Sequence, residues 1–135
     1  MKKPTIAKLK KSVWDLFSIY IRLRDCLKTT GTIDSGKCVT CGETFHFKKL
    51  QAGHFISGRH NANLFSEKGC HAQCKRCNLF LSGNVLVYRR KIIEMYGEGF
   101  DEVLENSNKI NKQFYRHELE TLKEIYKSKI EELRK

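Results

Sequence analysis

Two pairs of cysteines carry the clearest chemical signal in this sequence. Cys38 and Cys41 form one Cys-x-x-Cys pair, Cys74 and Cys77 form a second, and 32 residues separate the pairs. Four thiolates supplied in this way are the ligand set that a tetrahedral zinc ion takes from proteins. Because four cysteine ligands leave no coordination position open for water or substrate, we expect a structural Zn²⁺ that holds the fold together. Four buried cysteines without a metal are the weaker alternative, since two matched pairs in a reduced protein favour metal.

The other two cysteines are expected to lie outside this site. Cys70 is four residues before Cys74, and this spacing does not make a two-residue knuckle. Cys26 falls on a predicted helix, where a core thiol is the simplest interpretation.

A histidine and an asparagine occupy the positions best suited to catalysis. His54 lies between the cysteine pairs in the segment Gly53-His54-Phe55-Ile56-Ser57, and Asn78 follows the second pair directly. Phosphodiester hydrolysis requires a base that activates water, an electrophile at the leaving oxygen and cations that position the phosphates. His54 fits the role of the base. A structural histidine is the ordinary alternative, and Asn78 could instead cap the helix after the knuckle.

Further polar and basic residues surround these two positions. His71 is a secondary candidate that could orient a phosphate or contact the metal, but a neutral histidine packed on the zinc loop explains it almost equally well. Arg59 and His60 lie in a polar loop after His54, where arginine can clamp a phosphate with two parallel hydrogen bonds; solvated loop charges are the alternative. His46 is expected to face solvent on a strand. A surface that grips a phosphate backbone would use Lys75, Arg76, Arg89, Arg90 and Lys91, although each of them taken singly is explained by an ordinary solvated charge.

The order of these motifs resembles a known family. The resemblance rests on the stretches 20–25, 38–42, 52–57, 71–78, 81–84 and 88–89. In this order, they resemble the NinG/Rap recombination nucleases of lambda-like phages over roughly residues 14–97. More broadly, the arrangement resembles the HNH endonucleases, whose ββα-metal site is often clamped by a four-cysteine zinc.

The resemblance implies a metal-dependent DNA endonuclease that acts on branched recombination intermediates such as Holliday junctions and displacement loops (D-loops). His54 would then deprotonate the attacking water. Asn78 would help to hold one catalytic Mg²⁺ or Mn²⁺ at the scissile phosphate, and the products would carry a 5′ phosphate and a 3′ hydroxyl.

Two positions depart from the pattern of the HNH enzymes. Many of these enzymes place an Asp or His metal ligand directly before the base, where this chain has Gly53. The position two before His71 is Gly69 where the middle Asn of the motif is expected, and Asn63 is the nearest substitute. Ser82, one helical turn after Asn78, could face the same metal through water. The remaining metal ligand is therefore unassigned from sequence.

The charge balance points to a polyanionic partner. The chain has 26 Lys and Arg against 15 Asp and Glu, which gives a formal net charge of +11 spread along its length. Such a charge favours association with DNA or RNA, although ribosomal and membrane-surface proteins share it. No stretch approaches the roughly 20 apolar residues that span a bilayer, and the first eleven residues lack the apolar segment of a signal peptide. We therefore expect a cytoplasmic protein of the bacterial host cytosol, with no membrane partner.

The elements that must position these residues predict an α+β fold. At 135 residues, the chain fits a single domain with a long N-terminal helix over 5–28, a zinc-clamped HNH-like core over 31–97 and a C-terminal helical extension over 98–135. Apolar residues at spacings of three and four predict the first helix. Another helix is expected to begin near Asn84 and to end at Gly97. A short helix over 101–105 and a long one over 107–135 are expected after it. Two short strands and a knuckle are expected over 36–57, a loop over 58–69, and a helix from Cys74 that Ser82-Gly83-Asn84 interrupts.

Two other functions compete with the nuclease. A non-catalytic, zinc-containing nucleic-acid-binding module would use the same charge and cysteines, and a ribosome assembly protein would prefer structured RNA. If the substrate is a four-way junction, two cuts in opposing strands are needed, and a symmetric homodimer joined through the terminal helix would supply both active sites.

Overall fold

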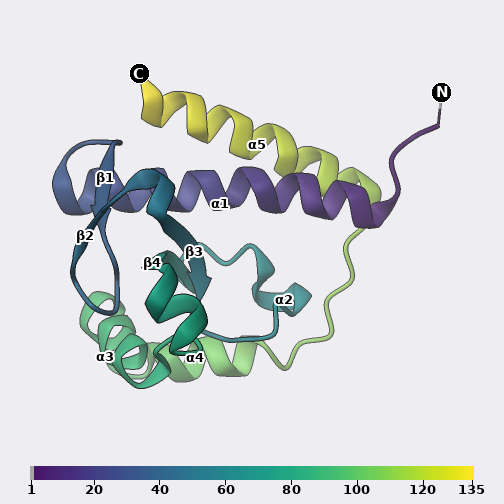
Figure 1. Ribbon diagram of the computed structural model, residues 1–135. Coiled ribbons are helices and arrows are strands. Elements are labelled where there is room, and N and C mark those ends of the chain that lie inside the picture. Colours follow the sequence, from purple (N-terminus) through teal and green to yellow (C-terminus); the bar gives the residue numbers. More distant parts are fainter. Residues whose placement is uncertain (1) are drawn as a thin grey trace.

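A long N-terminal helix separates two groups of elements in the computed structural model, which describes residues 2–135 (Figure 1). This helix, α1, spans Ile6–Thr30; it begins where the Thr5 hydroxyl accepts a hydrogen bond from the Lys8 N–H and ends at Gly31, whose φ of +80° is left-handed. The last helix, α5 (Arg116–Arg134), lies along one side of α1 and runs in the same direction, while the strands and the shorter helices lie on the other side. The predicted N-terminal helix is confirmed.

The main core forms on both sides of α1. Its buried apolar side chains recur at helical spacing, and they pack against Leu119 and Tyr126 of α5 and against the sheet residues Ala52 and Cys70. The stripe on α1 consists of Leu9, Val13, Phe17 and Ile21. α1 packs against α5 on one side and against these sheet residues on the other, so both groups of elements depend on it for their buried surface.

Four short strands form two antiparallel hairpins. β1 (Ser35–Lys37) pairs with β2 (Thr44–His46), and β3 (Leu50–His54) pairs with β4 (Cys70–Cys74). A 3₁₀ turn, Phe47–Lys49, joins β2 to β3. The prediction of two strands over 36–57 is wrong, because three lie there. β4 was not predicted, although its sequence Cys-His-Ala-Gln-Cys alternates apolar and polar residues; all five of its residues are buried.

The chain between β3 and β4 contains one short helix. Residues 58–69 were predicted as a loop, and within them the single turn α2 (Asn61–Leu64) interrupts the irregular backbone. The Asn61 side chain donates a hydrogen bond to the Lys112 carbonyl at 3.1 Å and accepts one from Lys10 at 2.6 Å, which ties this turn to two distant segments.

A widened helical turn follows β4. It is a π-helix over Arg76–Phe80, in which the N–H of Leu81 bonds the carbonyl of Arg76, five residues earlier, at 2.8 Å. Ser82, Gly83 and Asn84 then adopt positive φ values, 50°, 91° and 50°, and so break the helix as predicted. α3 (Val85–Tyr96) follows and ends at Gly97, and α4 is Phe100–Ser107. With strands followed by helices around a four-cysteine cluster, the predicted α+β class is confirmed.

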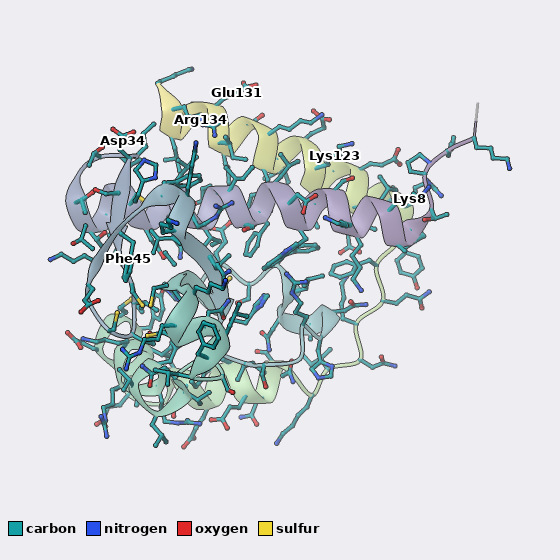
Figure 2. All side chains as sticks on the ribbon, in the orientation of Figure 1. Lys8, Asp34, Phe45, Lys123, Glu131 and Arg134 are labelled. Atoms are coloured by element: carbon teal, nitrogen blue, oxygen red, sulfur yellow. The ribbon has the colours of Figure 1, made fainter. Side chains whose placement is uncertain are left out.

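The prediction of a last helix over 107–135 is wrong in its first part. Residues 108–115 form a connection that crosses from α4 to the start of α5 (Figure 1). Ile110 is exposed, whereas Phe114 is buried against Phe65. The helix begins only where Glu118 accepts the N–H of Tyr115 at 3.4 Å. Exposed side chains such as Glu131 and Arg134 project from its last turns (Figure 2).

None of the helices within residues 2–135 combines the length and the apolar character needed to cross a membrane.

Candidate metal centre and adjoining candidate active site

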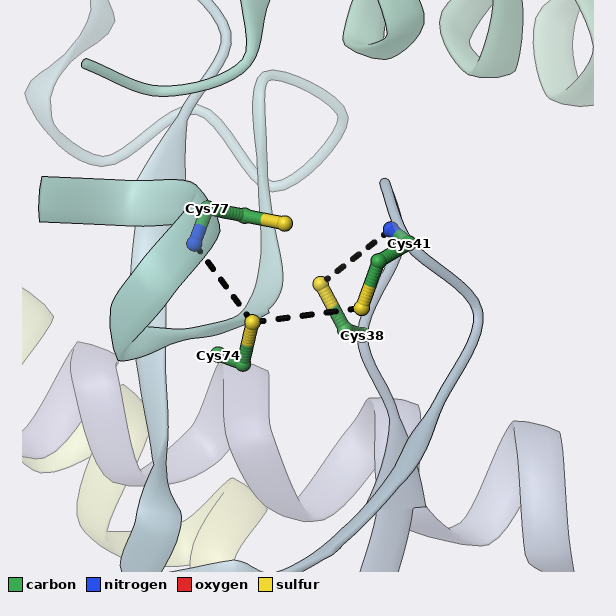
Figure 3. Close-up of side chains that lie close together, drawn as sticks. All are labelled: Cys38, Cys41, Cys74 and Cys77. Atoms are coloured by element: carbon green, nitrogen blue, oxygen red, sulfur yellow. Dashed lines mark hydrogen bonds between the residues drawn. The ribbon is translucent and has the colours of Figure 1, made fainter. Parts of the chain in front are cut away.

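The four cysteines of the two Cys-x-x-Cys pairs meet at one point (Figure 3). Their sulfur atoms all lie within 4.8 Å of one another, and the Sγ atoms of Cys41 and Cys74 are 3.9 Å apart. A tetrahedral zinc with Zn–S bonds of about 2.3 Å places its sulfurs about 3.8 Å apart. The cluster can therefore hold a zinc ion, and its four thiolates would fill the coordination sphere.

Hydrogen bonds around the cluster favour negative charge on sulfur. The N–H groups of Cys41 and Cys77 point at the sulfurs of Cys38 and Cys74, each at 3.5 Å. The Asn84 side-chain amide donates to the sulfur of Cys77 at 3.7 Å, so the first residues of α3 are tied to the same centre. Donors aimed at sulfur are the environment that thiolate ligands require.

Cys26 and Cys70 lie outside the cluster, as predicted. Both are completely buried, Cys70 in the core beneath α1 and Cys26 beside Leu50 and Ala72. Burial raises the pKa of the Cys26 thiol to about 11 and raises the pKa of Cys70 still further. Both groups are therefore neutral thiols at physiological pH.

His54 is the last residue of β3, and its ring is held on two sides. Its Nε2 lies 3.0 Å from the carbonyl oxygen of Leu64, and the ring stacks on the indole of Trp14 with centroids 5.1 Å apart. A carbonyl oxygen can only accept, so Nε2 carries the proton and Nδ1 is left as the basic nitrogen. Burial lowers the pKa of His54, the Leu64 carbonyl partly offsets this, and the positive charge of Arg59 lowers it further. The ring is therefore neutral at pH 7.

Trp14 is a site residue that the sequence interpretation missed. It is the only tryptophan of the chain and lies on α1, 40 residues before His54. The Arg59 guanidinium lies 4.1 Å from the centroid of the same indole. A large aromatic at the edge of the buried stripe of α1 was the available signal, since such a residue can contact both the core and a neighbouring site.

An open hollow of about 400 Å³ connects the principal sequence candidates. Its lining includes His54, Arg59, Asn78, Leu79, Ser82 and Val85. The structure thus brings together the predicted base, the predicted metal ligand, a predicted phosphate contact and the serine one turn after Asn78. No acidic side chain is among the lining residues, all of which belong to the described part of the chain.

Gly53 leaves space that Gln73, on the neighbouring strand, occupies. A Cβ atom at Gly53 would lie 1.9 Å from the Gln73 Oε1 and 3.0 Å from the Asn78 Oδ1. An Asp or His at this position, as in many HNH enzymes, would collide with Gln73. The glycine therefore leaves room for a glutamine that the sequence interpretation did not single out.

The buried side chain of Gln73 joins the cysteine cluster to the hollow. Its Nε2 donates to the Thr40 hydroxyl at 3.2 Å and to the Gly83 carbonyl at 3.0 Å, and Thr40 in turn lies 3.2 Å from the sulfur of Cys38. Its Oε1 is the buried side-chain oxygen for which residues 2–135 provide no hydrogen-bond partner. Asn78 is held separately, because its Nδ2 donates to the Gln51 side chain at 2.8 Å. The Asn78 Oδ1 therefore remains available as a ligand.

His71 lies in the interior and does not reach the hollow. Only 2 % of its surface is exposed; its Nδ1 is 3.1 Å from the Tyr88 hydroxyl and its Nε2 is 2.8 Å from the Tyr96 hydroxyl. The Tyr88 hydroxyl donates to the Gly53 carbonyl at 2.6 Å, so it accepts from Nδ1–H of His71. Burial lowers the pKa of His71 to about 4. The surroundings of His71 are those of a packed, neutral histidine, which is the alternative considered for this position.

Two other sequence candidates also lie away from the hollow. His60 is exposed at the start of α2, and it lines a different depression together with Asn108 and Lys112. Asn63, the substitute for the middle Asn of the motif, is buried and donates to the Leu104 carbonyl at 3.3 Å. Neither residue shares the surface lined by His54.

Within residues 2–135, the five basic residues predicted to grip a phosphate backbone divide into those without an ion pair and those with one. Lys75, Arg76 and Arg90 are exposed. Arg89 is paired with Asp101 and with Glu105, and Lys91 lies 3.7 Å from Glu94. The free cations are therefore the ones able to meet phosphates.

Comparison with known proteins identifies similar sequences from bacteriophages. Residues 2–135 match the family model described as Bacteriophage Lambda NinG protein. The chain is 33% identical over 99 residues to the Protein ninG of Escherichia phage lambda, a match that covers 72% of this chain and 47% of that protein. The Protein ninG of Escherichia phage 933W is also 33% identical, over 72% of this chain and 48% of its own length, and that of Salmonella phage P22 is 32% identical, over 72% and 47%.

The chain spans about half the length of the curated relatives it matches. No solved structure matches it significantly.

Proposed function

The chain belongs to the NinG family of bacteriophage proteins, and from this premise we propose that it is a metal-dependent DNA endonuclease of the HNH type. The proposal places the structural Zn²⁺ in the cluster of Cys38, Cys41, Cys74 and Cys77. It places the cleavage of the phosphodiester bond in the hollow beside this cluster, lined by His54 and Asn78. Zinc and catalysis are thus assigned to separate sites, because a four-cysteine site has no open position for a substrate.

The observation that carries the proposal is the fixed orientation of His54. The Leu64 carbonyl takes the proton on Nε2, which leaves Nδ1 as a hydrogen-bond acceptor with no proton of its own. Burial keeps the ring neutral, so it can accept a proton at physiological pH. A neutral imidazole that is oriented by a carbonyl and that lines an open hollow meets the requirements of a general base for an attacking water.

The hollow offers one side-chain oxygen for a catalytic cation. Mg²⁺ prefers oxygen ligands and usually takes carboxylates together with water and substrate phosphates. Here the Asn78 Oδ1 is neutral and no carboxylate lines the hollow, so Asn78 would hold the ion only together with water and phosphate oxygens. A bound Mg²⁺ or Mn²⁺ would neutralise charge on the scissile phosphate and on the leaving 3′ oxygen.

Positive charge around the hollow supports DNA as the substrate. Arg59 reaches its edge, and Lys75, Arg76 and Arg90 are exposed on the elements that follow β4. Contacts of this kind position a phosphate backbone without reading its sequence. The preference for branched recombination intermediates is part of the proposal on the strength of the family resemblance, and a homodimer would supply the two cuts that a four-way junction needs.

The absence of a carboxylate from the hollow favours one alternative function, a zinc-containing module that binds nucleic acid without cutting it. In this alternative, His54 and Asn78 serve the fold. The two functions differ in their response to Mg²⁺, because a binding module has no use for the ion beyond charge screening.

The deciding experiment compares wild type with His54→Ala and with a matched control, His46→Ala. His46 is exposed on β2 and does not line the hollow. All three proteins, checked for zinc content, are incubated with labelled four-way, forked and linear duplex DNA in the presence of Mg²⁺ or Mn²⁺. We expect nicks near the branch from wild type and His46→Ala, and a loss of at least about 100-fold in His54→Ala with unchanged DNA affinity. If all three proteins bind DNA tightly and none of them nicks it, the non-catalytic binding module is the function that remains.

A further inference from the structure

Five large apolar side chains are exposed together at the bend between the π-helix and α3. They are Leu79, Phe80, Leu81, Val85 and Leu86, with exposed fractions of 54%, 74%, 42%, 39% and 75%. Half of the ten exposed large hydrophobic residues in the described part of the chain therefore fall within eight positions. Scattered apolar residues on a surface need no explanation, whereas a concentration of them in one bend is a candidate interaction site. We call this group the apolar corner.

The backbone of the apolar corner is held firmly. The N–H of Gly83 bonds the Cys77 carbonyl at 2.9 Å, and the N–H of Asn84 bonds the Leu81 carbonyl at 2.9 Å. The Gly83 carbonyl accepts from the buried Gln73 at 3.0 Å. The exposed side chains therefore stand on a bend that is fixed to the cysteine cluster, and they are presented to solvent as a rigid projection.

The apolar corner adjoins the candidate active site. Leu79 and Val85 line the same hollow as His54, and Phe80 and Leu86 are their immediate neighbours in the chain. A ligand whose phosphate lies in the hollow can therefore contact the edge of the apolar corner that Leu79 and Val85 form.

Charge decides which occupant fits this surface. No Asp or Glu occurs between Glu67 and Glu94, whereas six Lys or Arg do, two of which (Arg89 and Lys91) pair with acidic residues outside this stretch; the whole chain carries a formal net charge of +11. A second copy of the chain would bring the same positive surface against itself, and the like charges would repel. A polyanion brings phosphates to the exposed cations and, if its bases are accessible, apolar rings to the corner. Nucleic acid is thus the complementary occupant.

Paired DNA cannot use the apolar corner fully. The faces of its bases are covered by stacking, and apolar side chains reach them only where a step is opened or a strand is unpaired. We propose that the apolar corner contacts unstacked bases next to the phosphate held in the hollow, and that this contact gives the protein its preference for DNA with unpaired bases or branch points. The inference rests on the proposed function, because it takes the hollow as the phosphate site.

The test measures binding to DNA that differs only in base accessibility. A corner variant, Phe80→Ser with Leu86→Ser, is compared with a control variant, Val103→Ser with Ile110→Ser, whose wild-type side chains are 51% and 66% exposed elsewhere. The probes are a perfect duplex, the same duplex with a three-nucleotide bubble containing 2-aminopurine, and a four-way junction. Binding is measured without Mg²⁺ or Mn²⁺ in proteins that also carry His54→Ala, so no cleavage is needed.

We expect the corner variant to bind the bubble and the junction at least about fivefold more weakly, since stacking on one base contributes roughly 1–3 kcal/mol. Its affinity for the perfect duplex stays unchanged, its effect on 2-aminopurine fluorescence is lost, and the control variant matches the parent. An equal loss on all three DNAs, or no loss on any, would overturn the inference. The inference would also be overturned if the parent and the control variant sedimented as dimers and the corner variant as a monomer, because a second copy would then be the occupant.

The two proposals fail separately. A bubble preference that depends on the corner, in a protein whose wild type never nicks DNA, would support the apolar corner and reject the nuclease. If wild type nicks DNA but the corner variant and the control bind all three DNAs equally well, the nuclease is supported and the apolar corner is rejected.

Discussion

The imidazole of His54 lies against the indole of Trp14, with ring centroids 5.1 Å apart and ring planes at 24°. The two residues come from different elements, since Trp14 belongs to α1 and His54 ends β3. Arg59 contacts the same indole with its guanidinium, 4.1 Å from the ring centroid. One aromatic side chain therefore sets the positions of both the proposed base and a proposed phosphate contact.

Replacing Trp14 tests this arrangement. Trp14→Ala removes the surface on which His54 stacks, so the rate of DNA cleavage is expected to fall by about two- to tenfold, the equivalent of one aromatic pair. Trp14→Phe keeps an aromatic ring at the same position and is expected to retain most of the activity. Single-turnover cleavage of a saturated substrate measures the effect, with zinc content as the check on folding. Equal activity in all three proteins would contradict a positioning role for Trp14.

The buried state of His54 predicts the pH dependence of cleavage. Burial and the nearby Arg59 lower the pKa of its imidazole below the usual 6.5, and the Leu64 carbonyl only partly offsets this. The ring therefore stays deprotonated as the pH falls to 6.5, and the acid limb of log(kcat/KM) is expected below that value. Arg59→Gln removes one of the two lowering effects and should move the limb to higher pH. An acid limb above pH 7 in the wild type would contradict this assignment.

His71 predicts a loss of stability in acid. Its pKa is lowered to about 4 in the folded protein, so the unfolded chain binds the extra proton first as the pH falls. The neutral, buried His71 therefore contributes its full stability above pH 6.5. As the pH falls from about 6.5 to 4, the free energy of unfolding decreases by up to about 3 kcal/mol, the equivalent of this pKa shift. The free energy of unfolding of His71→Gln, measured by urea denaturation, should fall less steeply over this window. Zinc release affects both proteins, so the difference between them is the informative quantity, and parallel curves would contradict the prediction.

Gly53 and Gln73 are expected to be energetically coupled. Gly53→Ala places a Cβ 1.9 Å from the Gln73 Oε1 and should destabilise the fold by roughly 1–3 kcal/mol. Gln73→Ala alone loses its bonds to Thr40 and Gly83. The double variant should be more stable than the sum of the two losses predicts, because the collision is absent. Strict additivity in a double-mutant cycle would show that Gln73 moves aside freely.

The cysteine cluster predicts one zinc per chain. Cys74→Ser removes a ligand, so zinc content should fall and the melting temperature should drop by more than about 10 °C, because binding of a structural zinc contributes directly to folding. Cys70→Ala is the matched control, since Cys70 is equally buried but lies outside the cluster. It should keep its zinc. Loss of zinc in the control, or its retention in Cys74→Ser, would show that the ligands are wrongly assigned.

Features that depend on short spacings could be predicted from the sequence. The repeat of apolar residues at three and four positions located α1, and the two-residue gaps within each cysteine pair located the cluster. The nearness of His54 to Asn78 was expected from motif order, and both line one hollow. Each of these inferences uses residues that are close in the chain or a pattern that a known family repeats.

Features that depend on pairing between distant segments could not be predicted. Gln73 fills the space beside Gly53 only because β4 pairs with β3 in the register that sets Gln73 opposite Gln51. The contact of Trp14 with His54 depends on the rotation of α1 over the sheet. In the C-terminal segment, Ile110 and Phe114 have helical spacing by coincidence, because the chain there must cross from α4 to α5.

The π-helix at Arg76–Phe80 has a consequence for how this region can vary. A π turn is an α-helix that has accepted one surplus residue, so its presence depends on segment length more than on the identity of any side chain. Point substitutions should leave the wide turn in place. Deletion of a single residue between Asn78 and Leu81 would remove the surplus residue and close the wide turn into an ordinary α-helical turn, which changes the side chains presented beside the hollow. The position of the apolar residues relative to His54 thus depends on the number of residues in this turn, and an insertion or deletion here is expected to disturb it more than a point substitution does.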